Sequence, residues 1–513
     1  MMGLPPFASS TRNEDGWLDA SPRLRRTVLS LLFLTGLVLR LIDLTDQPLD
    51  FHPTRQLRGA ILARAMYYEL QPEADPETRS KAMALAATLE AQEPPFLETL
   101  VAWGSLARGE ESPWLARAIN AAFWMGAGVV LYRLARRMMN ADGAVVAVGF
   151  FWTLPFAVFA SRSFQPEALM VLCFVGTVYA LRRWHETPTW VWALASGLLA
   201  GLTVLTKGRV ALMVLLVVVA VVVSRRGLRR APVEPMAWAM AAVMIGIPSV
   251  YYLGVIGPSS LGWISTTSGD FLWLSLEPSF YIRWLRFTDS MVRLPLVVFA
   301  LVGTLLMSTR SRAMQIGMWA GFVVYGVTLP YTIVTHNYYS LPLVPVVALG
   351  LGPTAAVILA KVSDKGRWVK ILSLGLAALS VAYPAFLTRS ALVGNDYRGE
   401  AGGWAEIGQA LPTDGRIIAV TQDYGYRLIY YGWRQVELWP SRADMESFAL
   451  QGHNADPDFV RSFNQRTAGF RYFLITNFGE FEGQPDLKAH LEANFPIARQ
   501  GPTFVVYDLA ADE

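Results

Sequence analysis

Long apolar stretches are the feature that most constrains how this chain can fold. A helix needs about 20 mainly apolar residues to cross the hydrocarbon core of a membrane. Eleven runs approach that length, near residues 27–45, 114–133, 141–160, 166–183, 189–206, 210–224, 236–256, 292–308, 313–332, 340–360 and 369–388. The chain is 53% hydrophobic and only 16% charged, which fits this pattern. We therefore predict a mainly α-helical, polytopic membrane protein with about 11 transmembrane helices.

Clusters of basic residues support this number of spans. Arginine and lysine concentrate in the cytoplasmic connections of membrane proteins, and here they occur at every second connection. The clusters are Arg23/Arg25/Arg26, Arg133/Arg136/Arg137, Arg182/Arg183, Arg225/Arg226/Arg229/Arg230, Arg310/Arg312 and Lys361/Lys365/Arg367/Lys370. This alternation predicts a multi-pass protein of the plasma (inner) membrane with a cytoplasmic N-terminus. Because the basic residues form no continuous stripe, we expect no nucleic-acid partner despite the formal charge of +4.

The outward connection over residues 46–112 is the longest one near the N-terminus. Pro53 can start a helix, and Asp75 followed by Pro76 matches an N-cap and a first-turn proline for a second helix. We expect both to be amphipathic helices at the membrane surface. They would belong to a transmembrane domain over residues 1–390.

The composition changes from about residue 395 to that of an ordinary globular protein. Four short β-like runs lie at 417–421, 436–438, 472–476 and 504–507, with helical patterns at 404–411 and 487–495. We therefore predict a small extracytoplasmic α/β domain over residues 391–513. No nucleotide-binding glycine motif, zinc-protease motif or paired CxxC occurs, and Cys173 is the only cysteine.

Asp50 and His52 follow the first apolar run at the predicted outer face. A carboxylate there can act as a general base on an acceptor hydroxyl. The structural alternative is that Asp50 caps the turn before Pro53.

Five cations fall on the predicted outer side, against the usual charge bias of membrane proteins. They are Arg55, Arg58, Arg162, Lys207 and Arg209. A lipid phosphate is a suitable partner, because guanidinium and ammonium groups stabilise phosphate oxygens. Snorkelling of a helix-end side chain toward water is the alternative. Lys207 fits that alternative least well, since only 206–209 separate two apolar runs.

Two carboxylates and one aromatic segment complete the candidate site. Glu93 lies in the segment QEPPF, and Glu167 lies in SRSFQPEAL at the start of the fourth run. Either can position an acceptor, orient Asp50 or hold a divalent metal ion, whereas a helix first turn and simple solvation are the alternatives. The segment THNYYSLPLVP adds His336, Tyr338 and Tyr339, which suit substrate contact or an interfacial aromatic belt. Glu93 and His336 are the candidate metal ligands, and no other cofactor is expected.

Taken together, these segments resemble the GT-C superfamily of polyprenyl-phosphate-dependent glycosyltransferases. The closest branch is that of the lipid A aminoarabinose transferase and the protein O-mannosyltransferases. The resemblance rests on an acidic residue after the first run, followed in order by TRQLRGAILARAM, EPP, SRSFQPEAL, GLTVLTKG and HNYYSLPLVP. It implies a GT-C fold and an inverting transfer of a sugar from a polyprenyl-phosphate donor to an acceptor hydroxyl at the outer membrane face.

The resemblance also implies residue roles. Asp50 would be the base, Arg55 and Lys207 would hold the donor phosphate, Glu93 and Glu167 would line the acceptor side, and His336 would lie nearby. One departure is that relatives often carry Asp-Glu directly before Thr-Arg, whereas His52 and Pro53 hold those places here. Either an insertion has moved the base to Asp50 or His52 has taken its role. Pro94 also replaces a lysine of some relatives.

Two other classes of protein compete with this interpretation. A multispan transporter or lipid flippase would show ionisable groups near the midplane of the membrane and often repeat symmetry, but here the charges gather at one face. A cell-envelope scaffold would leave the outward cations unexplained. The expected partners are a polyprenyl-phosphate-linked sugar, membrane lipids and an acceptor glycan, lipid or protein.

Overall fold

The structure is a computed structural model that describes residues 16–257, 269–453 and 458–510. Its contacts form two compact units. Unit 1 contains Met1–Leu44, Ala91–Pro94 and Arg117–Gly394, and unit 2 contains Thr45–Glu90, Pro95–Ala116 and Asn395–Glu513. The N-terminus, for which a cytoplasmic location is predicted, lies outside the described residues. The domain boundary near residue 390 and the membrane-surface position of the 46–112 segment stay predictions.

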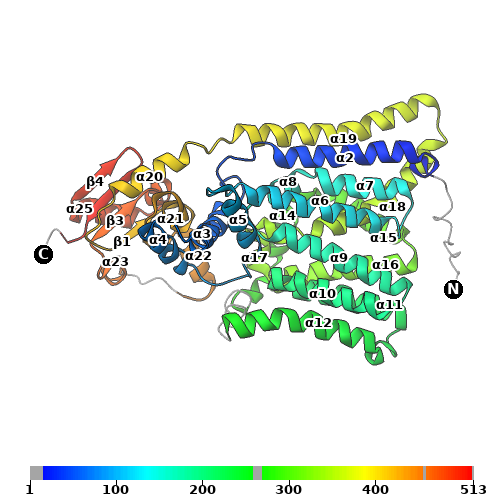
Figure 1. The fold of residues 1–513 in the computed structure, drawn as a ribbon, viewed down its shortest axis with the longest axis horizontal. Helices are drawn as coiled ribbons and strands as arrows, with labels where there is room; N and C mark the ends of the chain where they lie inside the picture. The colour runs from blue at the N-terminus through cyan, green and yellow to red at the C-terminus, as the bar shows by residue number, and fades with distance from the viewer. Residues whose placement is uncertain (1–15, 258–268, 454–457, 511–513) are drawn as a thin grey trace. The chain divides into compact units, whose positions relative to one another are not determined.

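Unit 1 is built from helices that run side by side (Figure 1). Its helices are α1 (Trp17–Ala20), α2 (Pro22–Leu41), α6 (Leu115–Ala135), α7 (Ala141–Thr153), α8 (Pro155–Ala160), α9 (Glu167–Glu186), α10 (Trp190–Thr206), α11 (Ala211–Arg226), α12 (Pro235–Tyr251), α14 (Pro278–Val292), α15 (Leu294–Leu306), α16 (Thr309–Thr328), α17 (Pro330–Thr335), α18 (Leu343–Ser363) and α19 (Arg367–Gly394). A helix occupies each predicted apolar run, so the prediction of a mainly helical multispan membrane protein is confirmed.

Fewer helices meet the length and hydropathy expected of a membrane span than the number of predicted apolar runs. Among the described residues, five helices are long and apolar enough to cross a membrane, and a sixth is added if α14 and α15, bent by 89°, count as one broken span. The helices α7 and α10 are apolar but shorter, and α2 carries Arg23, Arg25, Arg26 and Arg40. The count of about 11 transmembrane helices therefore stays a prediction.

Two glycines let α18 pack between its neighbours α7 and α15. A Cβ atom on Gly350 would collide with the backbone oxygen of Ala300 in α15, and one on Gly352 would collide with the side chain of Met139 and the backbone of Gly143 in α7. Residues two positions apart lie about 200° apart around a helix, so these glycines serve opposite faces. Such close backbone approach is typical of membrane helix interfaces, where small residues replace the hydrophobic driving force.

Unit 2 contains a five-stranded mixed sheet with the order β2-β1-β3-β5-β4. Its strands are β1 (Ile417–Val420), β2 (Glu437–Leu438), β3 (Tyr472–Ile475), β4 (Ile497–Gly501) and β5 (Phe504–Asp508). Strand β1 is parallel to β2 and β3, whereas β5 is antiparallel to β3 and β4. Four of the strands were predicted. Strand β4 was missed because its IARQG sequence is mostly exposed and has no apolar alternation.

Nine helices accompany the sheet among the described residues of unit 2. They are α3 (Pro53–Glu69), α4 (Pro76–Ala87), α5 (Phe96–Arg108), α20 (Glu400–Ala410), α21 (Tyr426–Gly432), α22 (Arg442–Leu450), α23 (Phe459–Thr467), α24 (Phe478–Glu482) and α25 (Pro485–Asn494). The predicted helix starts at Pro53 and Pro76 are confirmed, and Asp75 caps α4 by accepting from the Thr78 N–H at 2.8 Å. Helix α3 contacts α4, α5 and α21, so it buries residues around most of its circumference.

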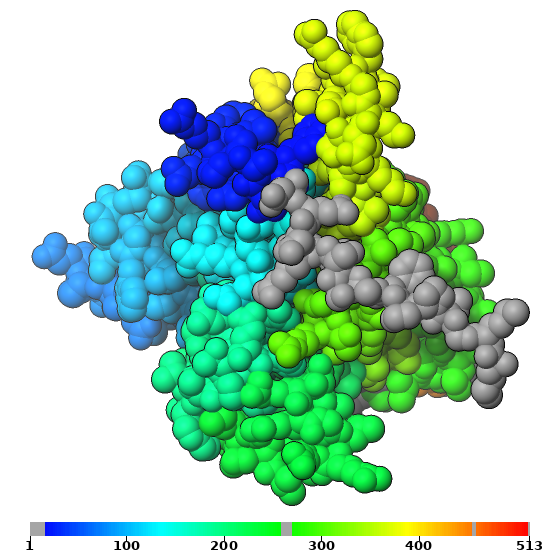
Figure 2. Space-filling view, turned by 90° about the vertical axis from the view of Figure 1, so that its right-hand side faces the viewer, coloured from blue at the N-terminus to red at the C-terminus, as the bar shows by residue number. Residues whose placement is uncertain are grey.

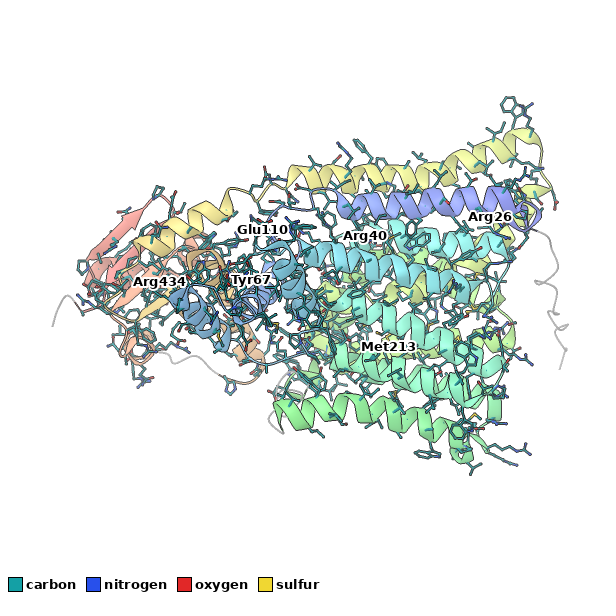
Figure 3. The ribbon with its side chains drawn as sticks, viewed as in Figure 1. Arg26, Arg40, Tyr67, Glu110, Met213 and Arg434 are labelled. Carbon is teal, nitrogen blue, oxygen red and sulfur yellow. The ribbon has the colours of Figure 1, made fainter. Side chains whose placement is uncertain are left out.

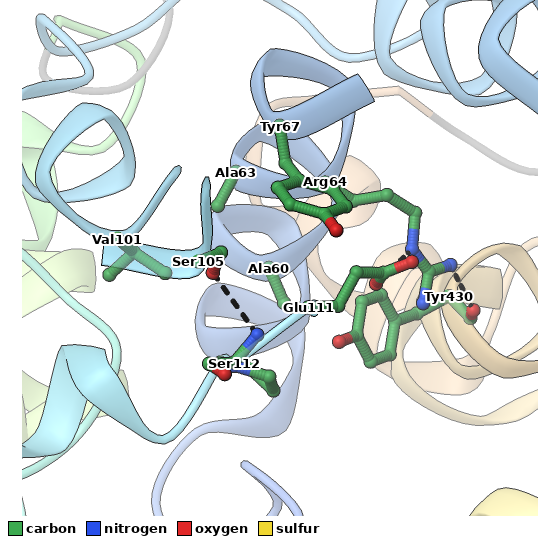
Figure 4. A pocket seen from close by; sticks show the side chains of 10 residues that line it. Ala60, Ala63, Arg64, Tyr67, Val101, Ser105, Glu111, Ser112 and Tyr430 are labelled. Carbon is green, nitrogen blue, oxygen red and sulfur yellow. Dashed lines mark hydrogen bonds and ion pairs between the residues drawn. The ribbon is translucent and has the colours of Figure 1, made fainter. Parts of the chain in front are cut away.

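Arg64 ties α3 to α21 inside unit 2. Its guanidinium carbon lies 4.0 Å from the ring centre of Tyr430 and 4.3 Å from that of Trp433. Its Nε lies 2.7 Å from Glu111 Oε2, and its Nη1 donates to the Tyr430 carbonyl at 2.5 Å (Figure 4). Burial raises the pKa of the Tyr430 phenol to about 12, so this hydroxyl stays protonated at neutral pH. These contacts hold residues more than 300 positions apart in one core.

Candidate active site

Lys207 is the centre of a buried ionic cluster in unit 1. Helix α10 ends at Thr206, and the extended backbone of Lys207 precedes a 3-10 turn, Gly208–Val210. Its Nζ lies 2.7 Å from Glu93 Oε1 and 2.8 Å from Glu167 Oε1. The Lys207 side chain is 4% exposed and that of Glu167 is 1% exposed. Because a buried charge is costly unless it is paired, the three groups stabilise one another in this position.

Aromatic side chains surround the ammonium group. Lys207 Nζ lies 5.4 Å from the ring centre of Tyr338 and 5.0 Å from that of Tyr339, within the range of cation–π attraction. Arg209 lies 4.9 Å from the Tyr339 ring centre, and its Nη1 donates to the Thr332 hydroxyl at 3.2 Å. The His336 ring contacts both tyrosine rings. Seven predicted site residues therefore meet here: Glu93, Glu167, Lys207, Arg209, His336, Tyr338 and Tyr339.

The turn before Glu167 is held by a residue that sequence reasoning missed. Asn120 in α6 is fully buried, and its Nδ2 donates to the carbonyls of Ser163 at 2.5 Å and Gln165 at 2.8 Å. These bonds fix the turn from which α9 starts, so they position the Glu167 carboxylate. The sequence signal that could have identified Asn120 is its polar amide within the apolar run of α6. Polar side chains inside membrane helices usually have a partner.

Arg162 lies in the same turn but points its guanidinium at a different partner. Its side chain is buried, and its Nη2 donates to the carbonyl of Asp43 at 2.9 Å. Arg117, another buried arginine, donates to the carbonyls of Asp43 and Leu44. Both arginines thus bind the backbone just after the end of α2. The predicted role of Arg162 in substrate binding stays a prediction.

The other four predicted residues belong to unit 2. Asp50 Oδ1 accepts from Gln56 Nε2 at 3.1 Å, and Gln56 is fully buried in α3. His52 precedes α3 with φ 49° and ψ 70°, in the left-handed region that non-glycine residues rarely adopt. Arg58 is buried and donates to the Glu90 carbonyl at 2.6 Å. Arg55 lies in the first turn of the same helix.

A metal site is not apparent from clustered ligands. Throughout residues 16–257, 269–453 and 458–510, no group of three His, Cys, Asp or Glu side chains is arranged to hold a metal ion. The suggestion that Glu93 and His336 bind a divalent ion stays a prediction.

The fold and the site together define the class of protein. It is a multispan membrane protein in which a buried lysine pairs with two carboxylates and lies beside two tyrosine rings. Residues 92–252 match the family model described as dolichyl-phosphate-mannose-protein mannosyltransferase. This matched segment includes Glu93, Glu167 and Lys207, all three members of the ionic cluster. A comparison with curated proteins finds no significant match in sequence.

Solved structures show the same fold. The chain is similar to the apo structure of ArnT from Cupriavidus metallidurans, with 17% identity, 94% of this chain and 98% of that one covered, and a TM-score of 0.54. It is also similar to the oligosaccharyltransferase AglB from Archaeoglobus fulgidus in complex with an inhibitory peptide and a dolichol-phosphate, with 12% identity, 90% and 70% covered, and a TM-score of 0.57. The predicted resemblance to membrane glycosyltransferases of the GT-C, protein mannosyltransferase and ArnT type is confirmed.

Proposed function

We propose that this chain is a membrane glycosyltransferase that moves a sugar from a polyprenyl-phosphate donor to an acceptor hydroxyl with inversion. The buried Lys207 cluster is the observation that carries the proposal, because it lies in the segment that matches the mannosyltransferase family model. ArnT from Cupriavidus metallidurans has been solved with undecaprenyl phosphate, with 16% identity, 95% of this chain and 98% of that one covered, and a TM-score of 0.50. A lipid phosphate is therefore a fitting donor group.

Lys207 and Arg209 supply the electrostatic part of the reaction. When the bond between the sugar and the phosphate breaks, negative charge grows on the departing phosphate, and nearby cations lower the energy of that state. Glu93 and Glu167 balance the two positive charges and keep Lys207 in place before the donor arrives. In a dry site, such interactions act more strongly than in water.

Asp50 or His52 takes the proton of the acceptor hydroxyl. Two observations support this segment as the source of the base. The buried Gln56 orients Asp50, and His52 has a strained backbone, a condition that clusters at functional sites. A single displacement, in which the acceptor oxygen bonds to the anomeric carbon as the bond to the phosphate breaks, gives inversion.

The active site lies at the outer face of a plasma membrane in this mechanism. The basic clusters at every second connection support this orientation through the positive-inside rule. The donor then arrives through the bilayer, already activated, and no nucleotide is required. The acceptor is a glycan, lipid or protein.

The direct test uses the purified full chain with a polyprenyl-phosphate sugar and detects the released polyprenyl phosphate by mass spectrometry. We expect Asp50→Asn or His52→Ala, whichever removes the base, to lower kcat by about 10²- to 10⁴-fold. Histidine ionises between pH 5 and 8, and a base works only when deprotonated. If His52 is the base, activity falls as the pH drops through this range, and Asp50→Asn keeps that dependence.

Full activity of both variants would remove this segment from the mechanism. A transporter or flippase would behave differently, since it would move a solute or lipid across liposomes that contain no lipid-linked sugar. Such movement without sugar transfer would overturn the proposed function.

A further inference from the structure

A second polar cluster lies at the other end of the helices that carry Lys207 and Glu167. Glu167 is the first residue of α9, and His185 lies 18 positions later in the same helix. At 1.5 Å per residue this separation is about 27 Å, close to the thickness of the hydrocarbon core. Figure 2 is viewed onto the end of unit 1 at which α9 and α11 finish.

His185 is a buried titratable group whose ring nitrogens are unsatisfied. The residue is 7% exposed, and within the described part of the chain neither Nδ1 nor Nε2 has a hydrogen-bond partner. A buried polar group in this condition costs stability, so a native structure that keeps one usually supplies a partner.

Three helix ends bring arginines to this imidazole. The charges of Arg182, Arg225 and Arg310 act on the His185 ring. Arg225 Nη1, at the end of α11, donates to the His185 carbonyl, and Arg182 Nη1 donates to Ser311 Oγ at 3.3 Å. The second bond places the end of α9 beside the start of α16, where Arg310 is the neighbour of Ser311.

The acidic residues of this region are occupied by other arginines. Glu186 pairs with Arg137 at 2.5 Å and with Arg182 at 2.9 Å, and Glu234 pairs with Arg226. Among the ion pairs that the described residues form, none involves Arg225 or Arg310. The charge of Glu186 also acts on the His185 ring and that of Glu234 acts on Arg225. Neither carboxylate forms an ion pair with Arg225 or Arg310 among the described residues.

We propose that Arg225, Arg310 and His185 bind a phosphate group at this end of unit 1. Guanidinium groups fit phosphate oxygens, and an imidazole N–H can donate to a further oxygen. The headgroup of an anionic phospholipid is one source of this group, since basic pockets between membrane helices on the cytoplasmic side bind such lipids. Free phosphate from the cytoplasm is the other source.

General topology rules do not account for this arrangement. Basic residues at helix C-termini favour the helix dipole, and basic residues in general favour the cytoplasmic side. Exposed side chains satisfy these rules, as Arg226 at the end of α11 and Arg229 beyond it do. Neither rule requires a buried imidazole without a partner. The site is also separate from the proposed catalytic cluster, so binding here is measured without glycosyl transfer.

The test measures the melting temperature and native mass spectra of the full chain in detergent. Phosphatidylglycerol, phosphatidylcholine and inorganic phosphate are titrated separately, with sodium chloride at matched ionic strength as a control. The variants are R225Q/R310Q and the milder R310Q, which changes one exposed side chain. The matched control is R229Q/R230Q, which removes the same charge from exposed positions.

We expect phosphatidylglycerol to bind the native chain and the R229Q/R230Q variant with equal affinity. Its affinity for the R225Q/R310Q variant should be lower by about tenfold or more. R310Q alone lowers the affinity by a smaller factor. If inorganic phosphate stabilises the chain as well as phosphatidylglycerol does, with the same order of variants, the site is supported and its ligand is the free anion. Equal weakening in both double variants, or no preference for either phosphate over phosphatidylcholine and chloride, overturns the proposal.

Discussion

The most informative residue in this protein is Lys207, because its neighbours define what it can do. An isolated ammonium in an apolar interior would lose its proton or unfold its surroundings. Here Glu93 and Glu167 lie within 2.8 Å of Nζ, and tyrosine rings cover the remaining side. Removing these charges from water costs desolvation free energy, and apolar residues of similar volume would stabilise the fold equally well. Stability alone therefore does not explain the cluster.

Lys207→Ala therefore has two separable effects. It leaves two carboxylates without their cation, and we expect a loss of about 3 to 5 kcal/mol in the free energy of unfolding. It also removes stabilisation of the leaving phosphate, for which we expect a decrease of about 10²- to 10³-fold in kcat/KM for the donor. Thermal denaturation and donor titrations at fixed acceptor measure the two effects.

The control is the triple variant Glu93→Gln, Glu167→Gln, Lys207→Met. It replaces the three charges by neutral groups of similar size, so stability should return to within about 1 kcal/mol of the native chain. Activity should stay lost. A triple variant that transfers sugar at the native rate would show that the cluster serves only the fold.

At the level of elements, a buried arginine stabilises the break between α7 and α8. Pro155 has no N–H and Leu154 leaves the helical conformation, so nearby carbonyls lose their intrahelical donors. Trp124 Nε1 donates to the Phe151 carbonyl at 3.0 Å, and Arg40 Nη1 donates to the Trp152 carbonyl at 2.7 Å. Side chains from α6 and α2 thus replace the missing bonds.

We expect Arg40→Leu to destabilise unit 1 by about 1 to 3 kcal/mol, because a buried carbonyl is left without a donor. Arg26→Leu is the control, since Arg26 lies in the same helix, is exposed and is distant from Arg40 along it (Figure 3). The measurement is the melting temperature of the full chain in detergent. Equal melting temperatures for the two variants would refute this role of Arg40.

The turn at residues 161–166 is a second element whose geometry depends on one side chain. We expect Asn120→Leu to lower kcat about tenfold, because the turn that positions Glu167 loses both bonds from Nδ2 and the reacting groups no longer align. Thr177→Val is the control for loss of a buried polar group, since the Thr177 hydroxyl donates to the Cys173 carbonyl within α9. Similar kinetics in the two variants would contradict a positioning role for Asn120.

At the scale of the whole molecule, membrane orientation is the property that the proposed function needs most. Cys173 is the only cysteine in the chain and is buried, which makes the protein suited to cysteine labelling. In a Cys173→Ser background, we expect Ser447→Cys to react with a membrane-impermeant maleimide in intact cells. Arg229→Cys should react only after the membrane is permeabilised.

The physical basis of this expectation is the positive-inside bias, which acts on the basic clusters during insertion. Arg229 is exposed and Ser447 is half-buried, and both lie outside the candidate site, so folding should be preserved. The reverse labelling pattern would place the proposed active site in the cytoplasm and contradict the orientation.

Much of the architecture could be predicted because it depends on local patterns. Apolar runs of membrane length, prolines at helix starts and the Asp75 cap are properties of neighbouring residues, and helices appear where these patterns predicted them. Strand β4 was missed because an exposed edge strand has no apolar alternation. The grouping of Glu93, Glu167 and Lys207 was expected from the family resemblance rather than from spacing.

The sequence by itself determined that this is a multispan helical membrane protein with cations and carboxylates at one set of connections, because hydrophobic length and charge bias act locally along the chain. Only the tertiary structure decided which groups meet. It paired Lys207 with two carboxylates, directed Arg162 to a backbone carbonyl, and joined Asp46 to the Tyr397 N–H within unit 2. These contacts join residues at least 40 positions apart in the chain, so they depend on the packing of distant segments, which no local pattern encodes.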